Sequence, residues 1–329
     1  MAAALVLCLC ALAPVLAEEP KALKGVALII GQSDYKHVGK LTNPENDARA
    51  IEEMFDKLGF ETNVVTNRDA RKLRRDLEGF VDDAEGADVA IIYYSGHGIE
   101  AGGENFLVPV DADISALDDA GEKLVPLSSI VAELKAKVPV TIVLLDACRN
   151  DPFPPGTLLK LAPGDDGKPI GAGGLGETRG VVSLKGDAEP KGSTDDSLGQ
   201  VIAFAAEPGK VALDGPADGN SPYAAAIMRH IDTMGGEEFG TVLRMIGEEV
   251  YLKTGGQQRP WVNESLRRLL YFGVAPEAPK GEAGEILTER RRLLVTISAL
   301  PDPERRQIES ISRDGGVPMD ALYAMLNTL

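Results

Sequence analysis

The sequence contains few cysteines and few histidines. Cys8 and Cys10 lie in an apolar N-terminal segment, so only Cys148 remains in the rest of the chain. A single thiol cannot close an internal disulfide, which leaves packing or chemical reactivity as its role. Three histidines occur in all, at positions 37, 97 and 230. So few histidines argue against a histidine-rich catalytic zinc site.

Basic residues are also under-represented. The chain has 34 lysines and arginines against 51 aspartates and glutamates, a formal net charge of −17. Nucleic-acid binding needs basic patches that neutralise phosphates, so this balance argues against a nucleic-acid partner. An acidic surface is compatible with basic ligands or cations, although a solvated acidic surface is the commoner explanation.

Long apolar runs are absent apart from one at the N-terminus. Residues 2–16 are uncharged and almost wholly apolar, and Val15-Leu16-Ala17 at their end resembles a small-x-small cleavage site. The run is too short to span a bilayer and has the length of a signal-peptide core, although no basic residue precedes it. We therefore expect residues 1–17 to be a signal peptide of an exported, periplasmic or secreted protein. A buried N-terminal strand or helix is the alternative, and no stable membrane insertion is expected once the leader is removed.

The remaining chain of about 310 residues has room for one large domain and an appendage. Strand-like and helix-like patterns alternate from 24 to 273, as in an α/β fold with a mostly parallel sheet. Expected strands cover 25–31, 60–66, 87–97, 138–148, 200–206 and 269–272. Helices are expected from Pro44 and over about 222–234 and 239–254. Two further helices are expected from apolar faces, one formed by Leu73, Leu77, Phe80 and Val81 and the other by Ile130, Val131 and Leu134. The Gly- and Pro-rich stretch 151–199 predicts a long linker-like loop. Residues 275–281 resemble a linker, and 282–329 form a helical tail of unknown role.

Two of the expected strands end in residues that can carry out catalysis. Ligands bind at the carboxyl ends of parallel strands, and His97 and Cys148 stand at two such ends. An adjacent imidazole stabilises a thiolate nucleophile and can protonate a leaving amine. The backbone N–H groups of Gly98 and Cys148 are candidates for an oxyanion hole. A lone cysteine is more often structural. His37 is interpreted as an exposed residue and His230 as a surface or boundary residue.

Five sequence blocks together resemble the caspase-like cysteine peptidases (peptidase family C14, clan CD), and specifically the bacterial metacaspase-like members. The blocks are GVALIIG at 25–31 with LTNPENDAR at 41–49, YYSGHG at 93–98, DACR at 146–149, FAAEPG at 204–209 with SPYAA at 221–225, and QRPW at 258–261. The resemblance covers roughly residues 24–273. It implies a caspase-like three-layer α/β sandwich with a six-stranded, mostly parallel sheet flanked by helices.

The resemblance also assigns roles to individual residues. His97 matches the catalytic histidine and Cys148 the nucleophile, while Asp47, Ser95 and Asp146 match an S1 pocket that receives arginine or lysine at P1. The chemistry agrees, because two carboxylates suit a guanidinium and would repel an aspartate side chain. Each acid also has a structural interpretation. Asp47 could stabilise the first turn of a helix, and Asp146 could cap a strand end.

No metal or other cofactor is predicted. Many metacaspases are activated by calcium, but this chain does not match their aspartates cleanly. Its loop-placed acids could ligate an ion through oxygen, although solvated loop residues are the simpler explanation. The acids are Asp111, Asp113, Asp118, Asp119 and Asp151.

Three functions remain open at this point. The first is an exported endopeptidase that acts on proteins or peptides with arginine or lysine at P1. The second is a catalytically silent caspase-like binding module. The third is another cysteine hydrolase on a related scaffold, which the scarcity of histidines disfavours. Self-cleavage in the long loop would be possible after Lys160, Lys168, Arg179, Lys185 or Lys191. The sequence gives no indication of the oligomeric state.

Overall fold

A computed structural model describes most of the region that the sequence assigns to the catalytic domain. The described residues are 23–101, 104–113, 120–147, 158–159, 168–169, 198–217, 219–233, 235–273, 300, 302–316, 318 and 321. The expected signal peptide at 1–17, Cys148 and most of the loop at 151–199 therefore lie outside them.

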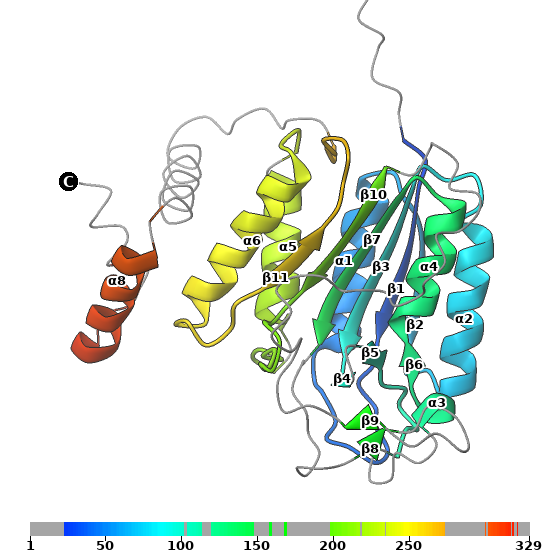
Figure 1. Ribbon diagram of the computed structural model, residues 1–329, viewed down its shortest axis with the longest axis horizontal. Helices are drawn as coiled ribbons and strands as arrows, with labels where there is room; N and C mark the ends of the chain where they lie inside the picture. Colours follow the sequence, from blue (N-terminus) through cyan, green and yellow to red (C-terminus); the bar gives the residue numbers. More distant parts are fainter. Residues whose placement is uncertain are drawn as a thin grey trace, which may run out of the picture.

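A six-stranded sheet forms the centre of the molecule (Figure 1), in the order β11-β10-β7-β3-β1-β2. Its strands are β1 (Gly25–Gly31), β2 (Glu61–Thr66), β3 (Val89–Gly96), β7 (Val140–Ala147), β10 (Gly199–Phe204) and β11 (Trp261–Glu264). Neighbours pair in parallel except for β10 and β11, which are antiparallel. Strands β1, β3 and β7 are buried along their whole length, which explains their continuous apolar sequences. The predicted mostly parallel sheet is confirmed.

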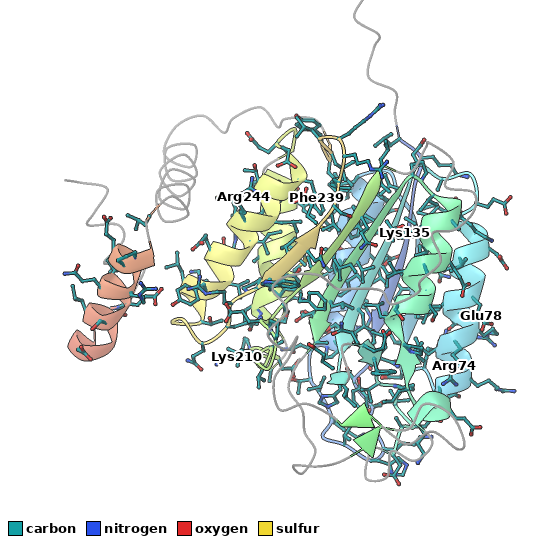
Figure 2. The ribbon with its side chains drawn as sticks, in the orientation of Figure 1. Arg74, Glu78, Lys135, Lys210, Phe239 and Arg244 are labelled. Atoms are coloured by element: carbon teal, nitrogen blue, oxygen red, sulfur yellow. The ribbon has the colours of Figure 1, made fainter. Side chains whose placement is uncertain are left out.

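Helices cover both faces of this sheet, so the fold has three layers (Figure 1). On one face lie α1 (Pro44–Lys57), α5 (Pro222–Thr233) and α6 (Phe239–Lys253). Figure 2 labels Phe239, the buried first residue of α6. The other face carries α2 (Ala70–Asp83) and α4 (Leu127–Lys137). This is the caspase-like sandwich that the sequence predicts.

Two apolar cores hold the layers together, because successive strand residues point to opposite faces. Tyr93 packs with the core beneath α1, α5 and α6, whereas the next residue, Tyr94, packs with the core beneath α2 and α4. The predicted apolar face of α2 is confirmed, since Leu73, Leu77, Phe80 and Val81 are all buried. Alternate residues of each buried strand therefore pack against the helices on opposite faces of the sheet.

Smaller elements follow β3 in the chain. Strands β4 (Gly98–Ala101), β5 (Glu104–Leu107) and β6 (Val125–Pro126) form a three-stranded antiparallel sheet, with the short helix α3 (Ala120–Lys123) before β6. Within the expected loop at 151–199, two short strands pair with each other. They are β8 (Leu158–Leu159) and β9 (Lys168–Pro169).

The prediction of the sixth strand was wrong. Residues 269–272 do not join the main sheet, and β11 takes the edge beside β10 instead. The backbone N–H groups of Phe239 and Gly236 donate to the carbonyls of Leu270 and Phe272, so this segment pairs with the turn before α6. Leu270 is buried and Phe272 packs against the core, and this alternation produced the strand-like pattern.

The interpretation of His230 as a surface or boundary residue was also wrong. Its side chain on α5 is buried, and Nε2 lies 2.7 Å from Oε2 of Glu249 on α6. Arg229 also pairs with this carboxylate. The charged cluster joins two helices on the face of the sheet that carries α1, whereas His37 is exposed as expected.

Part of the expected helical tail lies beside α6. Helix α8 (Asp302–Gly315) stands on the side of α6 away from the sheet (Figure 1). Ile308 packs with Tyr251 and Leu252 of α6, and Arg259 Nη2 lies 3.5 Å from Glu309 Oε1. The apolar residues that suggest a helical tail all fall outside the described residues; they are Leu293, Leu294, Ile297, Met319, Leu322, Met325 and Leu326. None of the described helices is long and apolar enough to cross a membrane.

Candidate active site

The site is built where β3 and β7 end side by side. Their parallel register pairs Ser95 with Asp146 and Gly96 with Ala147. The next residue after Gly96 is His97, and the next residue after Ala147 is Cys148, which lies outside the described residues. The chain therefore leaves both strands at the same edge of the sheet, as the sequence predicts for these two segments.

Two tyrosine hydroxyls fix the backbone of His97. Its N–H donates to the Tyr35 hydroxyl at 2.7 Å, and the Tyr94 hydroxyl donates to its carbonyl at 2.7 Å. The Tyr35 and His97 rings are in contact, with centroids 4.4 Å apart. Gly96 has no room for a side chain, because a Cβ atom there would lie 2.7 Å from the Tyr35 hydroxyl and 2.9 Å from the Tyr94 hydroxyl. The glycine before His97 is therefore required by packing.

The imidazole of His97 is held by a backbone carbonyl. Nε2 lies 2.6 Å from the carbonyl oxygen of Gly39. Because a carbonyl can only accept, this contact assigns the ring hydrogen to Nε2 in the neutral imidazole. Nδ1 is then the nitrogen with a free lone pair. A ring in this tautomer can take a proton at Nδ1 while Gly39 stabilises the resulting imidazolium.

Gly98 begins β4 in a pairing that directs its N–H away from β5. Gly98 stands opposite Leu107, and the neighbouring bond runs from Val108 N–H to the His97 carbonyl at 3.2 Å. This pattern marks Gly98 and Leu107 as a non-hydrogen-bonded pair of an antiparallel ladder. The Gly98 N–H is therefore not committed to β5.

Asp47 and Ser95 meet in the interior, next to the end of β3. Asp47 lies in the first turn of α1 and is 0% exposed. Its carboxylate accepts from Ser95 Oγ at 3.1 Å, Asn220 Nδ2 at 3.0 Å and Ser221 N–H at 3.0 Å. Burial outweighs these three hydrogen bonds and raises the pKa of Asp47 to about 6.

Asp146 lies beside this pair at the end of β7. It is buried and accepts hydrogen bonds from the Tyr93 hydroxyl at 3.3 Å and from Ser221 Oγ. Burial, followed by the charge of nearby Asp47, raises the pKa of Asp146 well above its usual range. The structure thus brings together Asp47, Ser95 and Asp146, the three residues that the sequence assigned to one pocket.

Asp214 is a third acid of the site that the sequence did not reveal. It lies in the loop between β10 and α5, where it accepts from Thr42 N–H at 2.8 Å and Thr42 Oγ1 at 2.6 Å. Asn43 stands at the N-cap position of α1 but makes no side-chain cap hydrogen bond, and its side chain donates instead to the carbonyls of Asp214 and Pro216. Nothing in the sequence indicates that this loop folds back onto the start of α1.

These groups line a small pocket. Its wall consists of Leu41, Pro44, Ser95, Gly96, His97, Asp146, Ala147, Ala212, Leu213, Asp214 and Ser221. The pocket has a volume of about 300 Å³, which includes the part open to solvent. Asp47 does not line it but contacts two residues that do, Ser95 and Ser221. Carboxylates crowded in this way favour a cationic ligand, since a bound cation lowers the cost of their ionisation.

The acids considered for calcium do not gather in the described part of the chain. Across the described residues, no three His, Cys, Asp or Glu side chains are grouped to hold a metal. Asp111 Oδ1 accepts from the Ala70 N–H at the start of α2, so this carboxylate has a structural partner. Asp118, Asp119 and Asp151 fall outside the described residues.

Comparison with known proteins identifies the class. A family model described as "Caspase domain", of the C14 peptidases, matches residues 24–271. The chain therefore belongs to the caspase-domain family of cysteine peptidases. The solved structure of caspase-1 from Spodoptera frugiperda shares the fold, with a TM-score of 0.53 and 17% sequence identity. That match covers 78% of this chain and 92% of the other.

Two curated proteins resemble part of the chain in sequence. The human mucosa-associated lymphoid tissue lymphoma translocation protein 1 is 28% identical over 134 residues, and its homologue from Mus musculus is 27% identical over 133 residues. Each match covers 40% of this chain and 16% of the relative. The chain thus corresponds to a small part of the curated relatives that it matches.

Proposed function

We propose that this protein is a metacaspase-like cysteine endopeptidase that cleaves peptide bonds after arginine or lysine. Cys148 acts as the nucleophile and His97 as its acid–base partner. One observation carries the proposal: Asp47 and Asp146 lie buried beside Ser95, at the same edge of the sheet as His97. A pocket with buried carboxylates suits the basic side chain of a P1 residue. His97 at the same sheet edge can then act on the carbonyl group of that residue.

The chemistry follows from the state of His97. Its Nδ1 takes the thiol proton, and the Cys148 thiolate attacks the carbonyl carbon to form a tetrahedral oxyanion. The N–H groups of Gly98 and Cys148 donate to that oxygen. Collapse breaks the C–N bond, and His97 returns its proton to the leaving amine. Water, deprotonated by His97, then hydrolyses the acyl-enzyme and restores the thiol.

Specificity for a basic P1 residue follows from the pocket's charge. Burial of Asp47 and Asp146 makes their ionised forms costly, and a guanidinium or ammonium group offsets that cost. Asp214 adds a second carboxylate, beside that of Asp146, to the wall of the pocket. An aspartate at P1 would bring a further negative charge into this group and would be rejected.

Peptides that differ only at P1 test the proposal. Wild-type protein and a Cys148→Ala variant are incubated with matched peptides carrying Arg, Lys or Asp at P1. Cleavage after Arg and Lys by the wild type alone is the expected result. Cleavage after Asp alone would contradict the acidic pocket, and no cleavage of any peptide would favour the silent binding module.

Export and domain organisation are part of the same proposal. Residues 1–17 are the leader, 24–273 the catalytic domain and 282–329 a tail. Mass spectrometry of the protein produced in a bacterial host with a periplasm tests the first boundary. A mature N-terminus at Glu18 in the periplasmic fraction is expected, whereas an intact leader on cytoplasmic protein would contradict export.

A further inference from the structure

The side chain of Gln258 joins the start of the loop that carries Asp214 to the middle of that loop, at Leu213. Gln258 is 0% exposed, and its Nε2 donates to the Ala205 carbonyl at 3.0 Å. Its Oε1 accepts from the Leu213 N–H, also at 3.0 Å. The backbone N–H of Gln258 donates in turn to Thr254 Oγ1 at 3.1 Å, which ties the residue to the end of α6.

The loop that Gln258 closes contributes directly to the pocket. Ala205 directly follows β10, while Leu213 and Asp214 line the same hollow as His97 and Asp146. Lys210, labelled in Figure 2, lies in this loop. Thr42 fixes the carboxylate of Asp214 from one side. Gln258 holds the backbone N–H of Leu213, the residue just before Asp214. The contacts with Thr42 and Gln258 together determine the position of Asp214.

We propose that Gln258 is a positioning residue for the substrate pocket and acts through Asp214. This inference rests on the proposed function, because it assigns the pocket to a basic P1 side chain. A glutamine is suited to the task since one planar amide supplies a donor for Ala205 and an acceptor for Leu213. Without Gln258, the Ala205 carbonyl and the Leu213 N–H would lose these hydrogen bonds, which would destabilise this conformation of the loop.

The first test is a near-isosteric replacement. Gln258→Met removes both hydrogen bonds with little change in volume. KM for a P1-Arg peptide should rise about tenfold, the scale set by loss of one or two buried hydrogen bonds, while kcat stays within about twofold. Gln200→Met is the matched control, because Gln200 is also buried but lies at the start of β10, the opposite end from Ala205. An equal rise in KM in both variants would overturn the proposal.

A double-mutant cycle asks whether Gln258 works through Asp214. In a background of Asp214→Ala, adding Gln258→Met should raise KM no further, because the group it positions is gone. Independent, multiplicative effects would contradict the inference. Gln258→Glu provides a second variant that keeps an acceptor for Leu213 and loses the donor to Ala205. Because a buried carboxylate would face the Ala205 carbonyl, the KM of this variant should rise at least as far as that of Gln258→Met.

A measurement without substrate separates this inference from the proposed function. Hydrogen exchange of the Leu213 amide should be faster in Gln258→Met than in the wild type and unchanged in Gln200→Met. If the wild type cleaves no P1-Arg or P1-Lys peptide, the proposed function fails, and this exchange rate alone decides whether Gln258 positions the loop. Unchanged exchange at Leu213 would overturn the inference even in an active enzyme.

Discussion

Asp47 and Asp146 share one hydrogen-bonding partner, Ser221. The Ser221 N–H donates to Asp47 Oδ1, and its hydroxyl donates to Asp146 Oδ2. The same hydroxyl accepts from the Ala224 N–H at 2.8 Å, as an N-cap of α5 does. The start of α5 therefore holds two carboxylates from distant parts of the chain in one place. Both the binding of a cation and the stability of the fold should depend on whether these acids are ionised.

Binding of a basic peptide should depend on pH through Asp47. Burial raises the pKa of Asp47 to about 6, and a cationic side chain binds the ionised form better. Ionisation of Asp47 should therefore make affinity rise as pH increases through about 6, by up to about tenfold per pH unit, and ionisation of Asp146 should add a further rise at higher pH. Isothermal titration of a P1-Arg peptide into Cys148→Ala protein measures this without interference from the thiol.

The matched control for this experiment changes only the acid. Cys148→Ala protein that also carries Asp47→Asn should bind the same peptide more weakly and with a flatter pH dependence. A peptide with an uncharged P1 residue should show no rise in affinity across the same range. Equal pH profiles with and without Asp47 would contradict the assignment.

The buried acid should also reduce stability at neutral pH. Because the folded-state pKa of Asp47 is raised from 3.8 to about 6, its favourable contribution is complete below the lower value and is lost as pH rises through about 6. Asp47→Asn keeps an acceptor for Ser221 and Asn220 and removes the charge. At pH 8 its free energy of unfolding should exceed that of the wild type by on the order of 1–3 kcal/mol.

Urea unfolding at several pH values provides the measurement. Asp56→Asn serves as the comparison, since it removes the same charge from an exposed side chain near the end of the same helix, α1. It should leave the pH dependence of unfolding unchanged. A loss of stability in Asp47→Asn at pH 8 would show that the carboxylate is needed for the fold in its ionised form.

Gly96 should be intolerant of a side chain. The Cβ atom of Gly96→Ala would meet the hydroxyls of Tyr35 and Tyr94, which hold the backbone of His97. Displacement of His97 should lower kcat by about a hundredfold or more, because proton transfer depends on position. Gly79→Ala is the control, since nothing lies within 4 Å of its Cβ position on α2. It should keep full activity and gain about 0.5–1 kcal/mol of stability.

Much of this site was predictable because its residues lie at strand ends. The buried strands β3 and β7 have unbroken apolar sequences, so the positions of His97 and Cys148 just beyond them follow from pattern alone. The acids Asp47 and Asp146 came from the family resemblance, since a carboxylate in the first turn of a helix has an ordinary structural explanation. Their burial and shared partner appear only in the folded chain.

What the sequence could not predict depends on long-range contacts. Asp214 lies 172 positions from Thr42, which it contacts, and local pattern carries no information about such a meeting. The Gly39 carbonyl is a backbone group with no sequence signature at all. The sixth strand was misplaced for a related reason, because residues 269–272 alternate between buried and exposed without joining the sheet.

The contact between α8 and the catalytic domain should depend on Ile308. This residue is half-buried and packs with Tyr251 and Leu252, whereas Ile311 of the same helix is 49% exposed. Ile308→Asp should release α8 and speed the hydrogen exchange of its amides, because burial of an unpaired charge is costly. Ile311→Asp introduces the same charge on the same helix and should leave exchange unchanged. Equal exchange in both variants would contradict the packing.

Self-cleavage should occur in the segment 151–199 if the enzyme cuts after basic residues. This segment contains Lys160, Lys168, Arg179, Lys185 and Lys191. Purified wild-type protein should yield fragments that end at one or more of these residues, and Cys148→Ala should remain intact under the same conditions.

Mixing the two proteins distinguishes cleavage within one molecule from cleavage between molecules, because cleavage of the inactive variant by the wild type requires attack between molecules. Fragments that appear equally in Cys148→Ala alone would point to a contaminating protease. Complete absence of fragments from a wild type that cleaves P1-Arg peptides would exclude processing of this segment and leave the proposed specificity intact.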